Sequence, residues 1–148
     1  MNKNKVCLSM ADTVSKKKRS EIMQKIRAQS KLENTVSREL WKRGIRFRKN
    51  SKSLFGTPDI SIKKYKVVIF IDSCFWHVCP LHWKRPKSNQ AYWDKKFARN
   101  KERDKEVTEF YIRRHWHIKR IWEHEIKEDL NKVIDDLVAF INHAKRNS

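Results

Sequence analysis

The sequence predicts a single α/β domain with a central mixed β-sheet flanked by helices. Three observations predict it. Apolar residues repeat at helical spacing in long stretches of the second half of the chain. The run VVIFI at 67–71 has strand composition without alternation, so we expect it to be covered on both faces. The expected order α-α-β-β-β-α-β-α then places helices against a sheet. At 148 residues the chain is long enough to bury one core without disulfides.

The N-terminal part of the chain is basic. Residues 1–14 are polar and lack periodicity, so we expect a flexible arm preceding a single domain at 15–148. A short basic helix is predicted from Ser15. Its first turns carry Lys16, Lys17, Lys18 and Arg19. These charges either form a solvated helix face or contact phosphates, and the overall charge of the chain favours phosphate contacts.

A second helix is predicted to open at Ser30, because Ser30-Lys31-Leu32-Glu33 matches a capping box. Leu32, Val36 and Leu40 share one face, and Gly44 is expected to end the helix. Glu33 would then bond back to the Ser30 N–H, and spacing alone favours that capping role over a catalytic one.

Strands are predicted at 45–48, at 59–62 and at 67–72, the last two joined by a tight turn at 63–66. Pro58 fits just before a strand, where no ladder donor is needed. The remaining predicted elements are a helix from Tyr92 to about Arg114, a strand at 116–122 and an amphipathic helix at 125–144.

The charge of the chain predicts a polyanionic partner. Its 36 Lys and Arg against 17 Asp and Glu give a formal net charge of +19, which is typical of a surface that binds phosphates. Nucleic acid is favoured over an anionic membrane, because no basic helix has a clean apolar face. No apolar run has the length of a signal peptide core or a membrane span, so we expect a cytoplasmic protein. Three cysteines, two of them close to histidines, favour a metal site or reduced thiols over disulfides.

The hairpin at 59–72 carries two acids. If its turn holds two or four residues, Asp59 lies opposite Phe70, and alternation puts Asp72 on the same face as Asp59. Converging carboxylates suit Mg²⁺, which could serve phosphodiester cleavage. His77 could then exchange a proton with the attacking water or bind phosphate. An odd-length turn would separate the acids, and Asp59 and Asp72 could also simply end a loop and a strand.

A second metal site is predicted just after the hairpin. Cys74, Cys79, His82 and His124 would form a Cys2His2 tetrahedron, which is typical of structural Zn²⁺. His77 is the alternative third ligand, but it cannot serve zinc and catalysis at once. Phe75 and Trp76 lie between these ligands, and Trp93 heads the next helix. Such rings are usually core, yet they could also be wedges that part the base steps of deformed DNA, at less cost where a base is mispaired.

Together these residues resemble the very short patch repair (Vsr) endonucleases, which nick DNA at T:G mismatches left when 5-methylcytosine deaminates and which belong to the PD-(D/E)xK-like nucleases. The resemblance extends from about Met10 to the last helix. It is carried by Thr13–Met23, Leu32-Glu33, GTPD at 56–59, VVIFIDSCFWH at 67–77, Trp93, RNKERD at 99–104 and IWE at 121–123.

The resemblance implies a restriction-endonuclease-like fold and an Mg²⁺-dependent nick 5′ to the mispaired thymine. Asp59 and the backbone carbonyl of Ile71 would hold Mg²⁺, with His77 catalytic and Glu33 near the site. It also implies that the four Cys and His residues named above hold structural zinc, that Phe75, Trp76 and Trp93 form the wedge, and that Asn100 contacts DNA. Where the best-known family member has a histidine, this chain has Asp72, which would add a metal ligand or replace a proton shuttle.

The partners implied are double-stranded DNA with a T:G mismatch, a functionally linked cytosine-5 methyltransferase and mismatch-repair proteins. The protein would act as a monomer in the bacterial cytosol. Two alternatives remain: a related nuclease without mismatch preference, and a zinc-containing DNA-binding module in which the acids are structural.

Overall fold

The computed structural model describes residues 15–148, so the arm expected at 1–14 lies outside the described residues. The chain divides into two compact units, one ending at Lys31 and one comprising Leu32–Ser148. The basic run at 16–19 belongs to the first unit, and apart from the half-buried Lys18 its residues are exposed. Among the described residues, no helix is long and apolar enough to cross a membrane.

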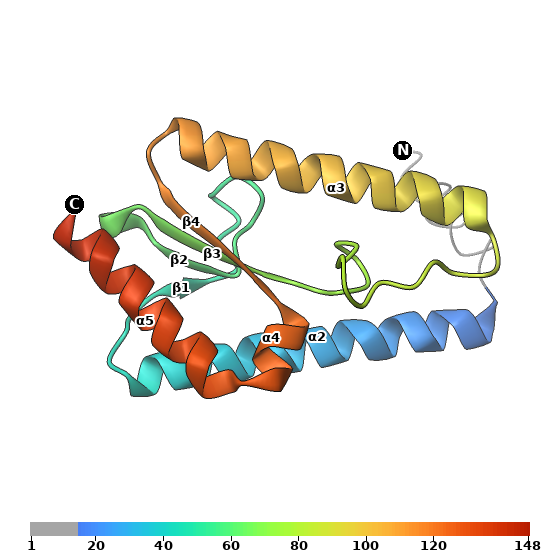
Figure 1. Ribbon diagram of the computed structural model, residues 1–148, viewed down its shortest axis with the longest axis horizontal. Helices are drawn as coiled ribbons and strands as arrows, with labels where there is room; N and C mark the ends of the chain where they lie inside the picture. The colour runs from blue at the N-terminus through green and yellow to red at the C-terminus, as the bar shows by residue number, and fades with distance from the viewer. Residues whose placement is uncertain (1–14) are drawn as a thin grey trace. The chain divides into compact units, whose positions relative to one another are not determined.

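One helix replaces the two predicted before Gly44. Helix α2, Lys16–Lys42, is continuous, so the prediction that a helix opens at Ser30 was wrong (Figure 1). The reason lies in the intervening residues, RAQSK at 27–31, which include no Gly or Pro and mostly favour the helix. A Ser-x-x-Glu spacing inside such a run has no exposed helix end to cap.

The predicted helix end at Gly44 is confirmed. Gly44 has a positive φ of +82°. The N–H of Ile45 donates to the carbonyl of Leu40 at 3.1 Å, and the N–H of Gly44 donates to the carbonyl of Trp41 at 3.0 Å. This is a Schellman motif. It also explains why the strand predicted at 45–48 is shorter and later, since Ile45 is engaged in the helix-ending turn.

The sheet is mixed, as predicted, and has the order β1-β2-β3-β4 (Figure 1). Its strands are β1 (Arg48–Lys49), β2 (Ile60–Ile62), β3 (Val67–Asp72) and β4 (His117–Trp122). The first two pairings are antiparallel and β3 pairs with β4 in parallel. Ile60 pairs with Ile69 across the four-residue turn at 63–66, which contains the short helix η1 (Lys63–Tyr65). An even-length turn with this register puts Asp59 opposite Phe70.

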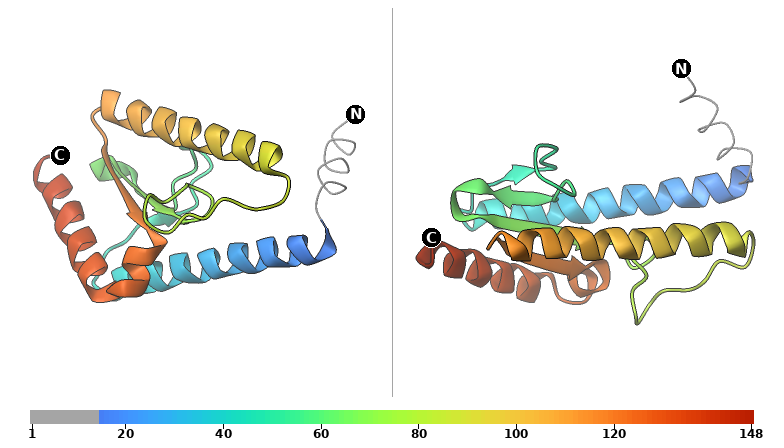
Figure 2. Two further views of the ribbon diagram at one scale, coloured as in Figure 1. Left: turned by 45° about the vertical axis from the view of Figure 1, so that its right-hand side comes forward. Right: turned by 90° about the horizontal axis from the view of Figure 1, so that it is seen from above.

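Strand β3 is buried along its whole length, and the two faces of the sheet carry separate clusters. On one face, Val68 and Phe70 pack against Val107 and Tyr111 of α3 (Gln90–Arg113). The other face packs against the C-terminal part of α2 and against α4 (Glu123–Glu128) and α5 (Leu130–Arg146). Figure 2 shows α3 and α5 on opposite sides of the sheet. This burial explains why the run at 67–71 lacks alternation.

The closing helix was predicted as one element but is two. Asp129 separates α4 from α5 with a non-helical φ of −152°, and its carboxylate accepts a hydrogen bond from the N–H of Lys132 at 3.0 Å. Asp is a preferred N-cap residue, so it starts a new helix here rather than continuing the old one.

The loop that carries Asp59 is held against α3. The hydroxyl of Tyr111 donates to the carbonyl of Phe55 at 2.6 Å, and a Cβ added at Gly56 would lie 2.7 Å from a methyl carbon of Val107. Gly56 also has φ +75°. Its lack of a side chain therefore permits both the backbone conformation and the close approach.

We expect Gly56→Ala to destabilise the fold by roughly 2–5 kcal/mol, because left-handed strain and overpacking against Val107 add. Gly44→Ala is the matched control: its φ is also positive, but a Cβ there meets nothing within 4 Å. It should cost only about 1–2 kcal/mol of strain. Urea unfolding measures both, and equal losses would show that the contact with Val107 contributes nothing.

Candidate active site and Cys/His cluster

Asp59 lies immediately before β2, with its carboxyl directed at the backbone of β3. Its Oδ2 accepts a hydrogen bond from the N–H of Ile71 at 2.7 Å, and its carboxyl shares a hydrogen bond with Glu33 of α2. Burial raises the pKa of Asp59 to about 7; the bond from Ile71 opposes that rise and the charge of Glu33 adds to it. Glu33 is therefore a neighbour of Asp59 rather than a helix cap.

Asp72 lies at the end of β3, 4% exposed, and its carboxylate is bound by Arg120 of β4. The Nη1 of Arg120 donates to Oδ1 at 2.9 Å and to Oδ2 at 3.1 Å. Burial raises the pKa of Asp72, while the charges of His77 and Arg120 oppose the rise. The charge of Asp72 also contributes to the raised pKa of Asp59, as the weakest of its causes. The counter-ion of Asp72 is thus an arginine of this chain.

His77 follows in the loop after β3 and contacts two acids. Its Nδ1 lies 2.6 Å from Oδ2 of Asp104 on α3 and 3.8 Å from Oδ1 of Asp72. Burial alone would lower the pKa of His77, but the hydrogen bond with Asp104 and the charge of Asp72 raise it overall. With Nδ1 bonded to Asp104, proton exchange with a bound substrate would use Nε2.

An open cavity of about 400 Å³ adjoins His77. The loop after β3, helix α3 and strand β4 all contribute to its wall. Its charged lining consists of Asp72, His77, Lys101, Asp104, Lys105, Glu109 and Arg120. A space of this size, with lysines on α3 beside the imidazole, can receive a phosphate-bearing group.

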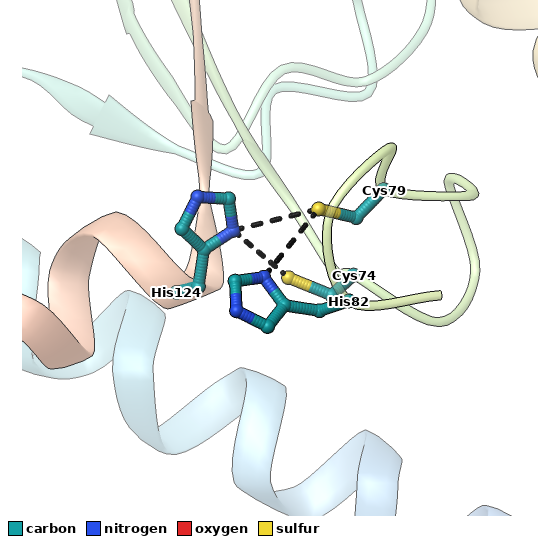
Figure 3. Close-up of side chains that lie close together, drawn as sticks. All are labelled: Cys74, Cys79, His82 and His124. Atoms are coloured by element: carbon teal, nitrogen blue, oxygen red, sulfur yellow. Dashed lines mark hydrogen bonds between the residues drawn. The ribbon is translucent and has the colours of Figure 1, made fainter. Parts of the chain in front are cut away.

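Four predicted ligands come together beside this site (Figure 3). The ligand atoms of Cys74, Cys79, His82 and His124 all lie within 4.8 Å of one another. Nδ1 of His124 is 3.3 Å from Sγ of Cys74 and 3.5 Å from Sγ of Cys79, and Nδ1 of His82 is 3.8 Å from the latter sulfur. In a tetrahedral zinc site, S and N ligand atoms lie about 3.5 Å apart. The spacing therefore fits Zn²⁺.

The cluster joins two parts of the chain. Three of its members lie in the loop after β3, and His124 lies in the first turn of α4. The neighbouring Glu123 accepts a hydrogen bond from the N–H of Cys74 at 2.9 Å. Burial raises the pKa of the Cys74 thiol to about 11, with its neighbour Cys79 contributing. His82, rather than His77, belongs to the cluster, and its role as a zinc ligand stays a prediction.

The three predicted wedge residues differ in exposure. Phe75 and Trp76 are half-buried, with ring centroids 4.8 Å apart. Trp93 is only 3% exposed, and its ring stacks on that of Phe97 with centroids 5.6 Å apart. It lies on the buried stripe of α3, and its part in a DNA wedge stays a prediction. Its ring centroid lies 5.8 Å from that of Phe75, so Trp93 packs against the loop between Cys74 and Cys79.

Asn100, predicted to contact DNA, donates from Nδ2 to the carbonyl of Trp76 at 3.0 Å. In this structure that amide holds the loop between Cys74 and Cys79 against α3. The basic run at 16–19 includes an ion pair between Lys18 and Glu21 at 3.7 Å.

Sequence reasoning assigned no role to Asp104, Arg120 or Glu123. Asp104 lies within the RNKERD segment at 99–104, where the resemblance implies a role for Asn100 but none for this acid. Arg120 offered a signal of its own: it is a charged residue inside a predicted core strand, which requires a buried partner. Glu123 precedes a predicted ligand and could have been expected to position it.

A sheet with buried acids and a histidine at one end, in a chain of net charge +19, suits an enzyme that acts on a nucleic acid. The family model described as DNA mismatch endonuclease Vsr matches residues 11–85. The chain belongs to the Vsr family, which confirms the resemblance found in its motifs.

Curated relatives agree with this assignment. The type II nicking enzyme V.NaeI of Lentzea aerocolonigenes is 38% identical over 122 residues, which cover 79% of this chain and 74% of the relative. V.HpaIIP of Haemophilus parainfluenzae is 40% identical over 105 residues, covering 70% and 74%. The DNA mismatch endonuclease Vsr of Escherichia coli (strain K12) is 33% identical over 117 residues, covering 77% and 74%. These relatives support a DNA endonuclease of the Vsr type.

Proposed function

We propose that this chain is an Mg²⁺-dependent endonuclease that nicks DNA 5′ to the thymine of a T:G mismatch. The observation that carries the proposal is the placement of the Asp59–Glu33 carboxyl pair and the His77–Asp104 pair around the end of one hairpin. The name of the Escherichia coli relative, a mismatch endonuclease, supports the substrate.

The carboxyl pair fits a divalent cation. Burial is the main cause that raises the pKa of Asp59 to about 7, and the contact with Glu33 adds to it. Two acids that share a hydrogen bond need a proton or a cation between them. Carboxylate and carbonyl oxygens are the ligands that Mg²⁺ prefers. Asp59 and the backbone carbonyl of Ile71 would hold the ion, with Glu33 beside it. Bound Mg²⁺ would supply polarisation of the phosphoryl oxygen and stabilisation of the leaving 3′ oxygen.

His77 supplies proton chemistry. Asp104 fixes the imidazole through Nδ1, which leaves Nε2 for the substrate. Because its pKa is raised, the imidazole keeps a proton to higher pH than an ordinary histidine does. A histidine in that state can hydrogen-bond a phosphate oxygen, or exchange a proton with the attacking water or the leaving oxygen.

The Cys/His cluster is proposed as structural zinc. All four ligands come from the protein, which is typical of a site that stabilises rather than reacts. Phe75 and Trp76 lie in the loop between Cys74 and Cys79, so the ion would fix the segment that carries both rings. Inserting rings between base steps requires unstacking, which costs less at a mispair. The loop between Cys74 and Cys79 would in this way favour mismatched sites.

Deamination of 5-methylcytosine opposite guanine creates T:G pairs. The proposal therefore links this chain to a cytosine-5 methyltransferase that makes the modified base, with double-stranded DNA as the direct partner. A chain of +19 would bind that DNA with steep salt dependence.

The test is a nicking assay on matched duplexes that differ at one base pair. We expect Mg²⁺-dependent cleavage of the thymine strand of a T:G duplex, and none with chelator or with a T:A pair. Phe75→Ala and Trp76→Ala should each reduce the preference for the mismatch. Trp41→Ala is the control, because Trp41 is 52% exposed on α2, outside the loop.

Equal cleavage of matched DNA would contradict mismatch recognition, and better cleavage of branched or flap substrates would favour the related nuclease without it. Salt-sensitive binding without any metal-dependent turnover would instead identify a DNA-binding module. Each of these outcomes is visible on one denaturing gel run beside a binding titration.

A further inference from the structure

We propose that Arg120 is a positioning residue for His77. Its guanidinium connects the end of β3 to one turn of α3, and these two elements carry the two acids that contact the imidazole. The inference rests on the proposed catalytic role of His77 and adds a residue to that site.

The guanidinium of Arg120 bonds in three directions. Nη1 donates to both oxygens of Asp72, at 2.9 and 3.1 Å, and Nε donates to Oγ1 of Thr108 at 2.9 Å. Nη2 donates to the carbonyl of Asp104 at 3.2 Å. The group also lies over the ring of Phe70, with Cζ 4.6 Å from its centroid. A planar fork with fixed donor directions can hold all these partners in one arrangement, which an ammonium cannot.

These bonds determine where Asp104 lies. Thr108 and Asp104 are one helical turn apart, and Oγ1 of Thr108 donates to the carbonyl of Asp104 at 2.8 Å. Arg120 thus fixes the turn of α3 from which the carboxylate of Asp104 reaches Nδ1 of His77 at 2.6 Å. Moving that turn would move the imidazole.

Arg120 also controls the second acid. Asp72 is 4% exposed and its Oδ1 lies 3.8 Å from Nδ1 of His77. Without the guanidinium, Asp72 would be a buried carboxylate with no counter-ion except the imidazole of His77. Because an uncompensated buried charge is costly, the carboxylate would then attract the imidazole. His77 would then be shared between two acids instead of being held by Asp104. Because Asp72 is bound to Arg120, its carboxylate helps to position His77 and does not serve as a ligand for Mg²⁺.

A phosphate contact is the rival role for Arg120, because the side chain lines the cavity. Three of its nitrogen atoms donate into the protein, however, and its side chain is only 22% exposed. Lys101 and Lys105, exposed on α3, line the same cavity and are better placed for a phosphate. The rival predicts weaker DNA binding, whereas positioning predicts a slower chemical step.

The experiment compares Arg120→Met, Arg120→Lys and Thr108→Val in nicking of T:G DNA at saturating Mg²⁺. We expect Arg120→Met to lower kcat roughly 10²-fold, as expected for a misplaced catalytic group, with KM for DNA nearly unchanged. Arg120→Lys should recover part of kcat, because it restores the charge beside Asp72 but not the fork. Thr108→Val keeps the shape of the side chain but removes the hydroxyl that accepts from Nε of Arg120 and donates to the carbonyl of Asp104, so it should give a smaller fall of the same kind.

A spectroscopic readout separates this inference from the proposed function. The proton shared by Nδ1 of His77 and Asp104 should give a low-field proton NMR signal, assigned by its loss in His77→Gln. That signal should be lost or shifted in Arg120→Met and kept in the control Arg113→Met, an exposed α3 residue paired with Glu109. This result would support positioning even if the wild-type chain cleaved none of the DNA substrates.

Three results would overturn the inference. They are an unchanged imidazole signal in Arg120→Met, an unchanged kcat, and a rise in KM that exceeds the fall in kcat. Thr108→Val tests the same bonds with little change in volume, so a folding failure of Arg120→Met would not leave the inference untested.

Discussion

Asp59→Asn is expected to reduce nicking of a T:G duplex roughly 10³-fold or more, while DNA binding stays measurable. The amide keeps the size of the carboxyl and can still accept the hydrogen bond from the N–H of Ile71. It lacks the negative charge that would hold Mg²⁺, whose contribution to such chemistry is several kcal/mol, or about 10³-fold in rate. Single-turnover nicking and a filter-binding titration measure the two properties separately.

The same variant should be at least as stable as the wild-type chain at pH 8 without metal. The folded pKa of Asp59 is about 7 against an ordinary 3.8, so ionising it costs folding free energy. That cost is absent below pH 3.8, grows between there and pH 7, and is constant above. Asparagine has no such cost. A loss of activity accompanied by an equal or higher Tm therefore cannot be ascribed to unfolding.

The pH dependence of metal use follows from the same group. At limiting Mg²⁺, nicking by the wild-type chain should rise as the pH passes through about 7, because a proton on Asp59 competes with the cation. Saturating Mg²⁺ should move that rise to lower pH. Asp136→Asn, an exposed acid on α5, is the matched control and should change neither activity nor this profile. An Asp59→Asn protein that nicks at the wild-type rate would remove this carboxylate from the mechanism.

The hairpin shows which parts of the fold the sequence could predict. Alternation and the Pro58 boundary are local and indicated the two strands, whereas the register that puts Asp59 opposite Phe70 depended on an even-length turn, which the structure has. The continuity of α2 was not predicted, because the Ser30–Glu33 spacing suits both a helix start and a helix interior. Only the tertiary contact between Glu33 and Asp59 shows what that acid does.

The candidate site also contains features that the sequence predicts and features that only the fold creates. The spacing of Cys74, Cys79 and His82 indicated a cluster that the structure brings together, because metal ligands near in sequence need little of the fold to meet. The partner of Asp72 was missed, since Arg120 is near it only through the parallel pairing of β3 with β4. The burial of Trp93 depends less on the rest of the fold, because its place on the apolar stripe of a helix indicates burial from the sequence alone.

His82→Ala and His77→Ala should separate the proposed zinc site from the proposed catalytic histidine. We expect the purified protein to contain one zinc per chain, and His82→Ala or Cys79→Ser to lose it. Their Tm should fall by about 10 °C or more, because a structural zinc site contributes several kcal/mol to folding. His77→Ala should keep its zinc and its Tm but lose nicking. Elemental analysis, thermal unfolding and the T:G assay measure these three properties.

The loss of zinc should also affect recognition differently from chemistry. Asp59 is held by β3 and α2, outside the loop between Cys74 and Cys79, so the zinc-free protein should keep the carboxyl pair. The same loop carries Phe75 and Trp76, and without its ligands it would no longer present these rings in a fixed position. Zinc-free protein should therefore show a higher KM for T:G DNA and a smaller preference over T:A, whereas His77→Ala should lower kcat. A chelated protein with an unchanged Tm and full mismatch preference would show that the four side chains meet without holding a metal.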